Sequence, residues 1–310
     1  MLDIARILLP TDGSACAERA RAWAEALAAR YEAVLHIVHV APVPRGEATY
    51  LLDDLHVTEA EIIGQLDQEA ARHAPPPESV ETSLHGTTVE RTLLGYARRH
   101  DIDLIVMGTH GRAGLHRVVA GSVTERVVRA APCPVLTVSP EAPDPPAELW
   151  TGLGSARRLL VPYDFSAHSA VALQVAHRLA TAHEAPLDLV HVVEEGALQG
   201  LYGLPGLTSG VIRRRIEDTL VRVATEADVP VRQAHVHGGR VAAKVLEQAA
   251  SEPTEVLVMA THSCNGVGRF LLGSVAGSVI RRAPCPVLVI NPTAKSLLPL
   301  ENRHVETTAL

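Results

Sequence analysis

A glycine-rich segment between two apolar runs is the part of the chain best suited to bind an anion. Leu104–Met107 is a short apolar run typical of a strand buried on both faces, and Gly108 and Gly111 follow it. Gly121 and Ser122 then open a predicted helix. Glycine permits positive φ and close approach of the backbone, and N–H groups at a helix start face negative charge. The segment therefore indicates a phosphate site, although glycine turns that only connect elements remain an alternative.

The helix after these glycines has recognisable boundaries. Ser122 and Glu125 have the spacing of a capping box, in which two side chains satisfy backbone N–H groups of the first turn. Pro132 and Pro134 end this helix, and Val135–Val138 is the next predicted strand. The order is strand, glycine loop, helix and strand, which is typical of an α/β protein.

The composition limits the class of protein. The chain has 310 residues, enough for about two domains, and 47% of them are hydrophobic, so a substantial core is available. A net charge of −7 argues against a general nucleic-acid or anionic-membrane surface. The four cysteines form no CxxC pair, which predicts reduced thiols in a cytoplasmic protein. The sequence shows no signal-peptide pattern and no apolar run long enough to cross a membrane, so no membrane span is expected.

The sequence repeats itself at an offset of 152 positions, as Asp12 and Asp164 illustrate. One constant offset aligns motifs along the whole chain, so the chain is a tandem duplication. The further matched pairs are His39-Val40 with His191-Val192, His85-Gly86 with His237-Gly238, Met107 with Met259, Gly121-Ser122 with Gly273-Ser274, and Pro132–Pro134 with Pro284–Pro286.

Each repeat alternates predicted strands with predicted helices. In the first repeat the expected strands are Ile4–Leu9, Val34–Val40, Val80–Leu84, Leu104–Met107 and Val135–Val138, and the expected helices are Ser14–Arg30, Thr58–His73, Thr87–His100 and the one that begins at 122. This order predicts two tandem doubly wound domains, each a five-stranded parallel sheet with flanking helices. Ligands of such sheets bind beyond the carboxyl ends of the strands, at the topological switch point.

The expected domains are residues 1–140 for the first repeat and 157–292 for the second, joined by a Pro- and Gly-rich linker at 141–156. A loosely held tail is expected at 293–310. Residues 196–210 carry glycine at every third or fourth position and are expected to form a mobile loop, with a lid or partner-docking segment as the alternative.

The spacing Gly108-x2-Gly111-x9-Gly121-Ser122, together with the Gly-Thr-His-Gly-Arg and Ala-Pro-Cys-Pro-Val segments, resembles the nucleotide loop of the universal stress protein family. The resemblance covers both repeats. It implies a Rossmann-like five-stranded parallel α/β fold and binding of ATP, with or without Mg²⁺. It also implies a stress-response or signalling role.

The resemblance carries over to individual residues of the first repeat. Asp12 would accept hydrogen bonds from ribose hydroxyls, although a turn or N-cap role in Asp-Gly-Ser is the alternative. Met107 would lie near the base. The residues implied to bind the nucleotide are Pro10, Thr11, Asp12 and Val40 around the adenosine, Met107, Gly108, Thr109, His110 and Gly111 along the loop, and Gly121, Ser122, Val123 and Thr124 at the phosphates.

The second repeat departs from this pattern. Extra Cβ atoms hinder close backbone approach and disfavour positive φ, and the capping box is lost. The substitutions are Ala260 for Gly108, Ser263 for Gly111, Ala276 for Thr124 and Gly277 for Glu125. We therefore expect one ATP per chain, bound in the first repeat.

Three hypotheses for function follow. The first is an ATP-binding stress-response protein that signals rather than catalyses rapid turnover. The second is a slow ATPase or nucleotidyl-transfer enzyme, and the third is a nucleotide-free assembly scaffold. The sequence has no GxxxxGK[ST], GxSxG or HExxH motif, so no catalytic residues are assigned. His235 and His237 would share one face of a strand, but spacing fixes no further metal ligand and no metal site is assigned.

The last strand of each repeat, Val135–Val138 and Val287–Ile290, is apolar and would lie at a sheet edge. Exposed edges are a liability unless they are covered. In the universal stress protein family the last strands often pair between subunits, so the resemblance implies that the two repeats pair within the chain, with a homodimer as a further step.

Overall fold

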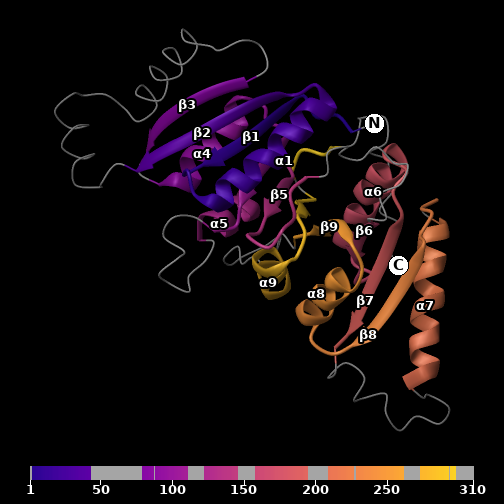
Figure 1. The fold of residues 1–310 in the computed structure, drawn as a ribbon. Helices are drawn as coiled ribbons and strands as arrows, with labels where there is room; N and C mark the ends of the chain where they lie inside the picture. Colours follow the sequence, from indigo (N-terminus) through magenta and orange to yellow (C-terminus); the bar gives the residue numbers. More distant parts are fainter. Residues whose placement is uncertain are drawn as a thin grey trace.

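The computed structural model describes residues 2–42, 79–86, 88–110, 122–145, 158–194, 209–226, 228–261, 273–292 and 294–297. Strands and helices alternate through most of this part of the chain, except that β3 follows β2 and β6 follows β5 in the described order, as Figure 1 shows. The helix predicted at Thr58–His73 lies outside the described residues. Residues 196–208 of the Gly-rich segment also lie outside them, and Ser209 begins a helix.

The first half follows the predicted order closely. Its elements are β1 (Arg6–Thr11), α1 (Ala15–Tyr31), β2 (Val34–Pro42), β3 (Ser79–Gly86), α4 (Val89–Arg99), β4 (Leu104–Gly108), α5 (Ser122–Ala130) and β5 (Val135–Val138). The first strand begins at Arg6 rather than Ile4 and includes Pro10 and Thr11, which were expected just beyond it. Its carboxyl end therefore lies directly beside Asp12.

The second half has the same order with one further described helix, α7, between its second and third strands. Its elements are β6 (Arg158–Pro162), α6 (Ala167–Ala182), β7 (Leu187–Val193), α7 (Ser209–Glu226), β8 (Gln233–Gly238), α8 (Val241–Ser251), β9 (Thr254–Ala260), α9 (Ser274–Arg282) and β10 (Val287–Ile290). Equivalent N-caps begin the first helix of each half: Ser14 accepts from the Ala17 N–H, and Ser166 accepts from the Ser169 N–H.

The described strands form one sheet in the order β3-β2-β1-β4-β5-β10-β9-β6-β7-β8. All pairings within each half are parallel. The predicted fold class of two doubly wound, five-stranded parallel α/β units is therefore confirmed. The strand order reverses between β1 and β4 in the first half and between β6 and β9 in the second, which places a switch point in each.

The two halves meet where β5 pairs with β10, and this is the antiparallel step of the sheet. Leu136 lies opposite Leu288, which is its equivalent at the repeat offset. The Tyr31 hydroxyl lies 2.9 Å from His183 Nε2, and these residues are also 152 positions apart. Equivalent residues can meet only on a rotation axis, so a pseudo-two-fold axis passes through both contacts.

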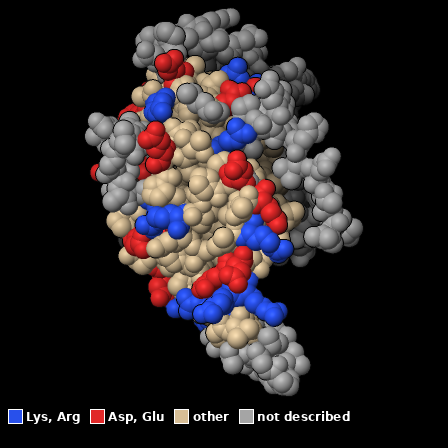
Figure 2. Space-filling model, turned by 90° about the vertical axis from the view of Figure 1, so that its right-hand side faces the viewer, with Lys and Arg blue, Asp and Glu red and all other residues tan. Residues whose placement is uncertain are grey.

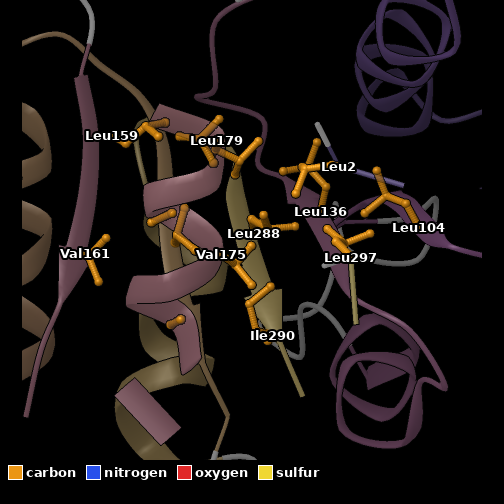
Figure 3. Packing of buried hydrophobic residues seen from close by; sticks show 14 of the residues in the cluster. Leu2, Leu104, Leu136, Leu159, Val161, Val175, Leu179, Leu288, Ile290 and Leu297 are labelled. Carbon is orange, nitrogen blue, oxygen red and sulfur yellow. The ribbon is translucent and has the colours of Figure 1, made fainter. Parts of the chain in front are cut away.

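Helices cover both faces of the sheet. One buried cluster joins α1, α6 and α7 to one face, and a second joins α4, α5, α8 and α9 to the other. Successive side chains of β1 alternate between them: Ile7 and Leu9 belong to the first cluster and Leu8 to the second. Figure 3 shows Leu136 from β5 beside Leu288 from β10, with residues of both halves around them. The core is therefore continuous across the junction.

The start of the linker packs on α1. Trp23 is fully buried, and its Nε1–H donates to the Pro143 carbonyl at 3.0 Å. Arg19 donates to the Ala142 carbonyl at 2.9 Å, and Ala142 is itself buried. These contacts attach the first linker residues to the first repeat before the chain crosses to the second.

Residues 294–297 also pack on the first repeat. The Lys295 N–H donates to the Pro132 carbonyl at 2.7 Å, and its ammonium lies 2.5 Å from Asp103 and 2.9 Å from Asp101. Leu297 is 2% exposed. The expectation of a loosely held tail is therefore wrong for these four residues. Contacts such as that of Lys295 with Asp101, 194 positions apart, are not revealed by any local pattern.

One buried position is filled differently in the two repeats. In the first, His36 Nδ1 lies 2.9 Å from the Tyr96 hydroxyl, and burial together with nearby His100 and Arg6 lowers the pKa of His36 to about 4. The equivalent residues of the second repeat are Asp188 for His36 and Gln248 for Tyr96. His36 is therefore neutral at pH 7, where the second repeat holds a carboxylate.

Candidate functional site

The structure brings the sequence-predicted residues of the first repeat to one edge of the sheet. Asp12 follows β1, Val40 lies near the end of β2, and Met107 and Gly108 end β4. These strands are neighbours at the switch point. Gly111 and Gly121 lie outside the described residues, whereas α5 begins at Ser122. The apolar and acidic parts of the predicted site therefore meet at the expected carboxyl edge.

Asp12 organises the turn between β1 and α1. Its Oδ1 accepts a hydrogen bond from the Ser14 N–H at 3.0 Å, and the Gly13 N–H donates to Thr11 Oγ1 at 3.2 Å. Gly13 has φ of +69°, a conformation that favours glycine. The turn role weighed for Asp12 is thus present. A carboxylate has about four acceptor positions, so this bond is compatible with a second role toward a ligand.

His39 was not among the predicted site residues, yet it supports this turn. Its Nδ1 lies 2.9 Å from the Thr11 carbonyl oxygen. Because a carbonyl oxygen can only accept, Nδ1 carries the proton and donates. His191 makes the same bond to the Tyr163 carbonyl at 2.8 Å in the second repeat. The sequence did contain a signal for this bond, because the two histidines recur at the repeat offset. Their shared role is to support the turn after the first strand of each repeat.

Gly108 is glycine because α1 packs closely against β4. A Cβ atom at this position would lie 2.9 Å from both the carbonyl oxygen and the Sγ atom of Cys16. These separations are shorter than real Cβ contacts allow. Sequence reasoning assigned this glycine to close approach of a ligand, and the structure supplies a packing reason in addition.

Substituting Gly108 with alanine is expected to lower the free energy of unfolding by about 1–3 kcal/mol, because α1 must shift to accommodate the methyl group. Gly95 in α4 gives a matched control, since a Cβ there meets no atom within 4 Å. Gly95→Ala should raise stability by up to about 1 kcal/mol through helix propensity. Urea unfolding followed by circular dichroism measures both. Equal stability of Gly108→Ala and the wild type would contradict the packing argument.

Thr109 and Thr124 make internal bonds at the end of β4. Thr124 is 4% exposed, and its hydroxyl donates to the Gly108 carbonyl at 2.9 Å. The Thr109 N–H donates to the Val138 carbonyl at 3.0 Å, and its Oγ1 lies 2.9 Å from His110 Nδ1. In this state these groups attach α5 and β5 to the end of β4. Val123, the remaining predicted phosphate residue, lies half-buried in the first turn of α5.

The Glu125 carboxylate of the predicted capping box makes an ion pair outside α5. The helix begins at Ser122 itself, and the Glu125 carboxylate pairs with Arg281 of α9. Arg281 is far away in sequence, so this partner was not predictable from local spacing. The first turn of α5 is consequently linked to the second repeat.

A cavity of about 400 Å³ lies at the switch point of the second repeat. Its lining includes Asp164, Val192 and Met259, the equivalents of Asp12, Val40 and Met107. Gly273 and Ser274 at the start of α9 also line it. The second repeat, in which nucleotide binding was in doubt, thus has a formed cavity at the position equivalent to the predicted site.

The two histidines considered as metal ligands, His235 and His237, each have a ring nitrogen close to a polar side chain. The parallel rings of His235 and His237 have centroids 6.4 Å apart on β8. His235 Nε2 lies 3.4 Å from Asp188 Oδ2, and His237 Nε2 lies 3.0 Å from Gln248 Oε1. Among the described residues, no group of three His, Cys, Asp or Glu side chains has a metal-binding arrangement.

The surface and the helices give further information on partners. Figure 2 shows acidic and basic side chains interspersed over one face, and the basic group near its lower end adjoins acidic residues. A nucleic-acid-binding face typically carries a continuous basic patch instead. Within the described part of the chain, no helix has the length and apolar character needed to span a membrane.

Comparison with known families gives matches in both halves of the sheet. The sequence model of the universal stress protein family matches residues 4–139 and 155–291. The two matches begin and end close to the boundaries of the two five-stranded units. Together they cover most of the chain.

Individual relatives match over the same regions. A universal stress protein of Mycobacterium tuberculosis strain H37Rv is 28% identical over 301 residues, covering 91% of this chain and 96% of the relative. One from Thermus aquaticus is 34% identical over 136 residues, covering 43% of this chain and 98% of its own.

Solved structures show the same fold at lower identity. A functionally unknown protein from Pseudomonas aeruginosa PAO1 superposes with a TM-score of 0.61 at 18% identity, covering 94% of this chain and 93% of that one. A universal stress protein from Archaeoglobus fulgidus gives 0.59 at 20% identity, with 92% and 98% coverage. These likenesses concern the fold alone.

Proposed function

This chain belongs to the universal stress protein family, and from that premise we propose that it binds ATP in its first repeat and signals rather than catalyses rapid turnover. Membership of the family supports a stress-response role. The observation that carries the nucleotide proposal is the meeting of Asp12, Val40 and Met107 at the switch point, beside the helix that begins at Ser122.

The residues at this edge fit the parts of a nucleotide. Val40 and Met107 are buried apolar side chains, suited to the face of a base. Asp12 is a half-buried carboxylate, suited to accept from ribose hydroxyls. The first turn of α5 offers backbone N–H groups to phosphate oxygens. ATP itself supplies a phosphoanhydride, whose presence or slow cleavage can carry a signal.

Mass spectrometry of ligand released from the purified protein is the direct test. Adenine nucleotide in a ratio of about one per chain supports the proposal. Isolation without nucleotide, combined with an absence of ATP binding in calorimetry, would contradict it. That second outcome would favour the scaffold hypothesis, which the pairing of β5 with β10 and the shared core also support.

Hydrolysis of ATP is expected to be slower than about 1 s⁻¹, the low end of ordinary enzyme turnover. Phosphoryl transfer requires positioned charge around the phosphates. The chain has two lysines, and both form ion pairs: Lys244 with Glu247, and Lys295 with Asp101 and Asp103. A phosphate-release assay with Asp12→Ala as the control checks this. Faster turnover that depends on Asp12 would instead support the slow-ATPase or nucleotidyl-transfer alternative.

The proposal also covers assembly and location. We expect the two repeats to remain paired in solution, with association of two chains into a homodimer as a further step. The β5–β10 pairing and the Ser139 hydroxyl, which donates to the Ala283 carbonyl at 2.7 Å, support the intramolecular contact. A cytoplasmic location is part of the same proposal. Light scattering distinguishes one chain from two.

A further inference from the structure

The cavity of the second repeat has the same place in the fold as the proposed ATP site but a different chemistry. Three of its lining residues differ from their equivalents in the first repeat: His168 replaces Cys16, Glu194 replaces Pro42, and Ala260 replaces Gly108. A fourth, Ala276, stands for Thr124 and removes a hydroxyl. These changes are concentrated in the wall and mouth of one cavity, so its ligand should differ from that of the first repeat.

The charge around the cavity disfavours phosphate. Its described lining contains two carboxylates, those of Asp164 and Glu194, and neither lysine nor arginine. Asp164 matches Asp12 of the proposed ATP site, so Glu194 is the additional negative charge. Both carboxylates belong to solvent-exposed residues. His191, which also lines the cavity, uses Nδ1 to bond the Tyr163 carbonyl. A negative mouth repels anions and attracts neutral or cationic ligands that carry hydrogen-bond donors.

The interior of the cavity is apolar. Met259, Val245 and Ala276 are buried, and Ala260 adds a methyl group where the first repeat has glycine. A volume of about 400 Å³ lies within the range of sites that hold small organic molecules. A flat apolar ring therefore suits the interior, with donor groups directed toward the carboxylates at the mouth.

An aromatic side chain stands beside the mouth at a conformational cost. Phe165 has φ of +63° and is 41% exposed, whereas its equivalent, Gly13, has φ of +69°. A bulky side chain in this region is strained, so glycine would be the less costly residue. The Phe165 ring lies 4.9 Å from the His191 ring and meets Tyr163 edge to face at 5.4 Å. Despite this strain, Phe165 places an exposed aromatic ring next to His191, which lines the cavity.

We propose that the cavity of the second repeat is a separate binding site for an unphosphorylated, ring-bearing molecule with hydroxyl donors, of the chemical class to which nucleosides belong. The apolar interior and the Phe165 ring hold the ring system, and Asp164 and Glu194 accept from the hydroxyls. Glu194, which replaces Pro42 of the first repeat, selects against phosphorylated forms. This site goes beyond the proposed function and does not depend on ATP binding in the first repeat.

Adenosine, AMP and ATP are the probes, applied to the full-length protein by calorimetry and saturation-transfer NMR. Adenosine binding should weaken about tenfold in Phe165→Gly, because a stacking surface is lost. This variant relieves backbone strain, so loss of binding cannot be attributed to unfolding. Glu194→Lys should reverse the preference and favour AMP over adenosine. Asp12→Asn, in the first repeat, should leave adenosine binding at the second site unchanged.

The outcomes separate the two proposals. Adenosine binding that responds to Phe165→Gly and not to Asp12→Asn supports the second site, whatever ATP does in the first repeat. Adenosine that binds nowhere at millimolar concentration, or only where Asp12 is intact, overturns it. Equal affinity of the second site for adenosine and ATP also overturns it, since Glu194 would then exert no selection. Failure of ATP binding alone affects only the first-repeat proposal.

Discussion

Asp12→Ala is expected to weaken ATP binding about 10- to 100-fold, the effect of losing hydrogen bonds to a charged group, whereas Asp164→Ala leaves ATP binding unchanged. The two residues are equivalents in the tandem repeat, and each accepts from the N–H two residues later at 3.0 Å. Both substitutions therefore remove the same turn bond. A difference between them in calorimetry therefore shows that the loss of affinity depends on the first repeat and is not a general effect of breaking such a turn.

Asp12→Asn refines the comparison. Asparagine keeps an oxygen that can accept from the Ser14 N–H, so the turn persists while the charge and part of the acceptor capacity are lost. Weak ATP binding by Asp12→Asn supports a ligand role for the carboxylate. Wild-type affinity in this variant, with loss only in Asp12→Ala, would show that Asp12 acts through the turn alone. Two equal sites per chain, or loss of ATP with Asp164→Ala, would place the nucleotide in the second repeat.

The fold was predictable because its signals are local and duplicated. Alternating strands and helices, read twice at one offset, predicted the parallel sheets, and β5 runs over the predicted Val135–Val138. β1 begins and ends two residues later than predicted. This difference changes which residues end the strand, but they still lie at the carboxyl edge of the sheet. Patterns of period 2 and 3.6 survive such shifts, which explains why the architecture was accessible from sequence.

The candidate site was predictable in position but not in its contacts. The carboxyl ends of neighbouring parallel strands converge in any doubly wound sheet, so Asp12 and Met107 could be placed together. The reason for Gly108 depends on Cys16, which lies in a different element. The partner of Glu125 is Arg281, across the junction of the repeats. Contacts of this kind depend on packing between distant segments, which local spacing does not encode.

The second repeat has a buried ionic cluster at the amino ends of β6 and β7, in which Arg158 matches Arg6 of the first repeat but Asp188 replaces His36. Arg158 is 1% exposed and pairs with Asp188, which is fully buried. Arg158 also donates to the Gln248 carbonyl at 2.7 Å. Arg232 bonds both oxygens of Asp188, at 2.9 and 2.6 Å, and so provides a second cation. The corresponding place in the first repeat holds neutral His36 and Tyr96.

The pKa of Asp188 shows that the cluster favours its ionised form. Burial raises this pKa, but hydrogen bonds from Arg232 and Arg158 outweigh burial, and the pKa lies below its usual value. A carboxyl whose folded-state pKa is lowered stabilises the fold above its unfolded-state pKa, near 4. That contribution is lost as pH falls through the folded-state pKa. At neutral pH the cluster is therefore at full strength, and a substitution there should have its largest effect.

Arg158→Met is expected to lower the free energy of unfolding by about 3–5 kcal/mol at pH 7, because Asp188 stays buried with one of its cations removed. The double variant Arg158→Met with Asp188→Leu should recover most of this loss, since apolar pairs often replace buried ion pairs without penalty. Urea unfolding at pH 7 measures both variants. Below pH 4 the defect of the single variant should shrink, because protonation of Asp188 removes the uncompensated charge. A single variant as stable as the wild type would show that Arg232 alone compensates Asp188. A double variant no better than the single one would show that Arg158 stabilises the fold by packing rather than by charge.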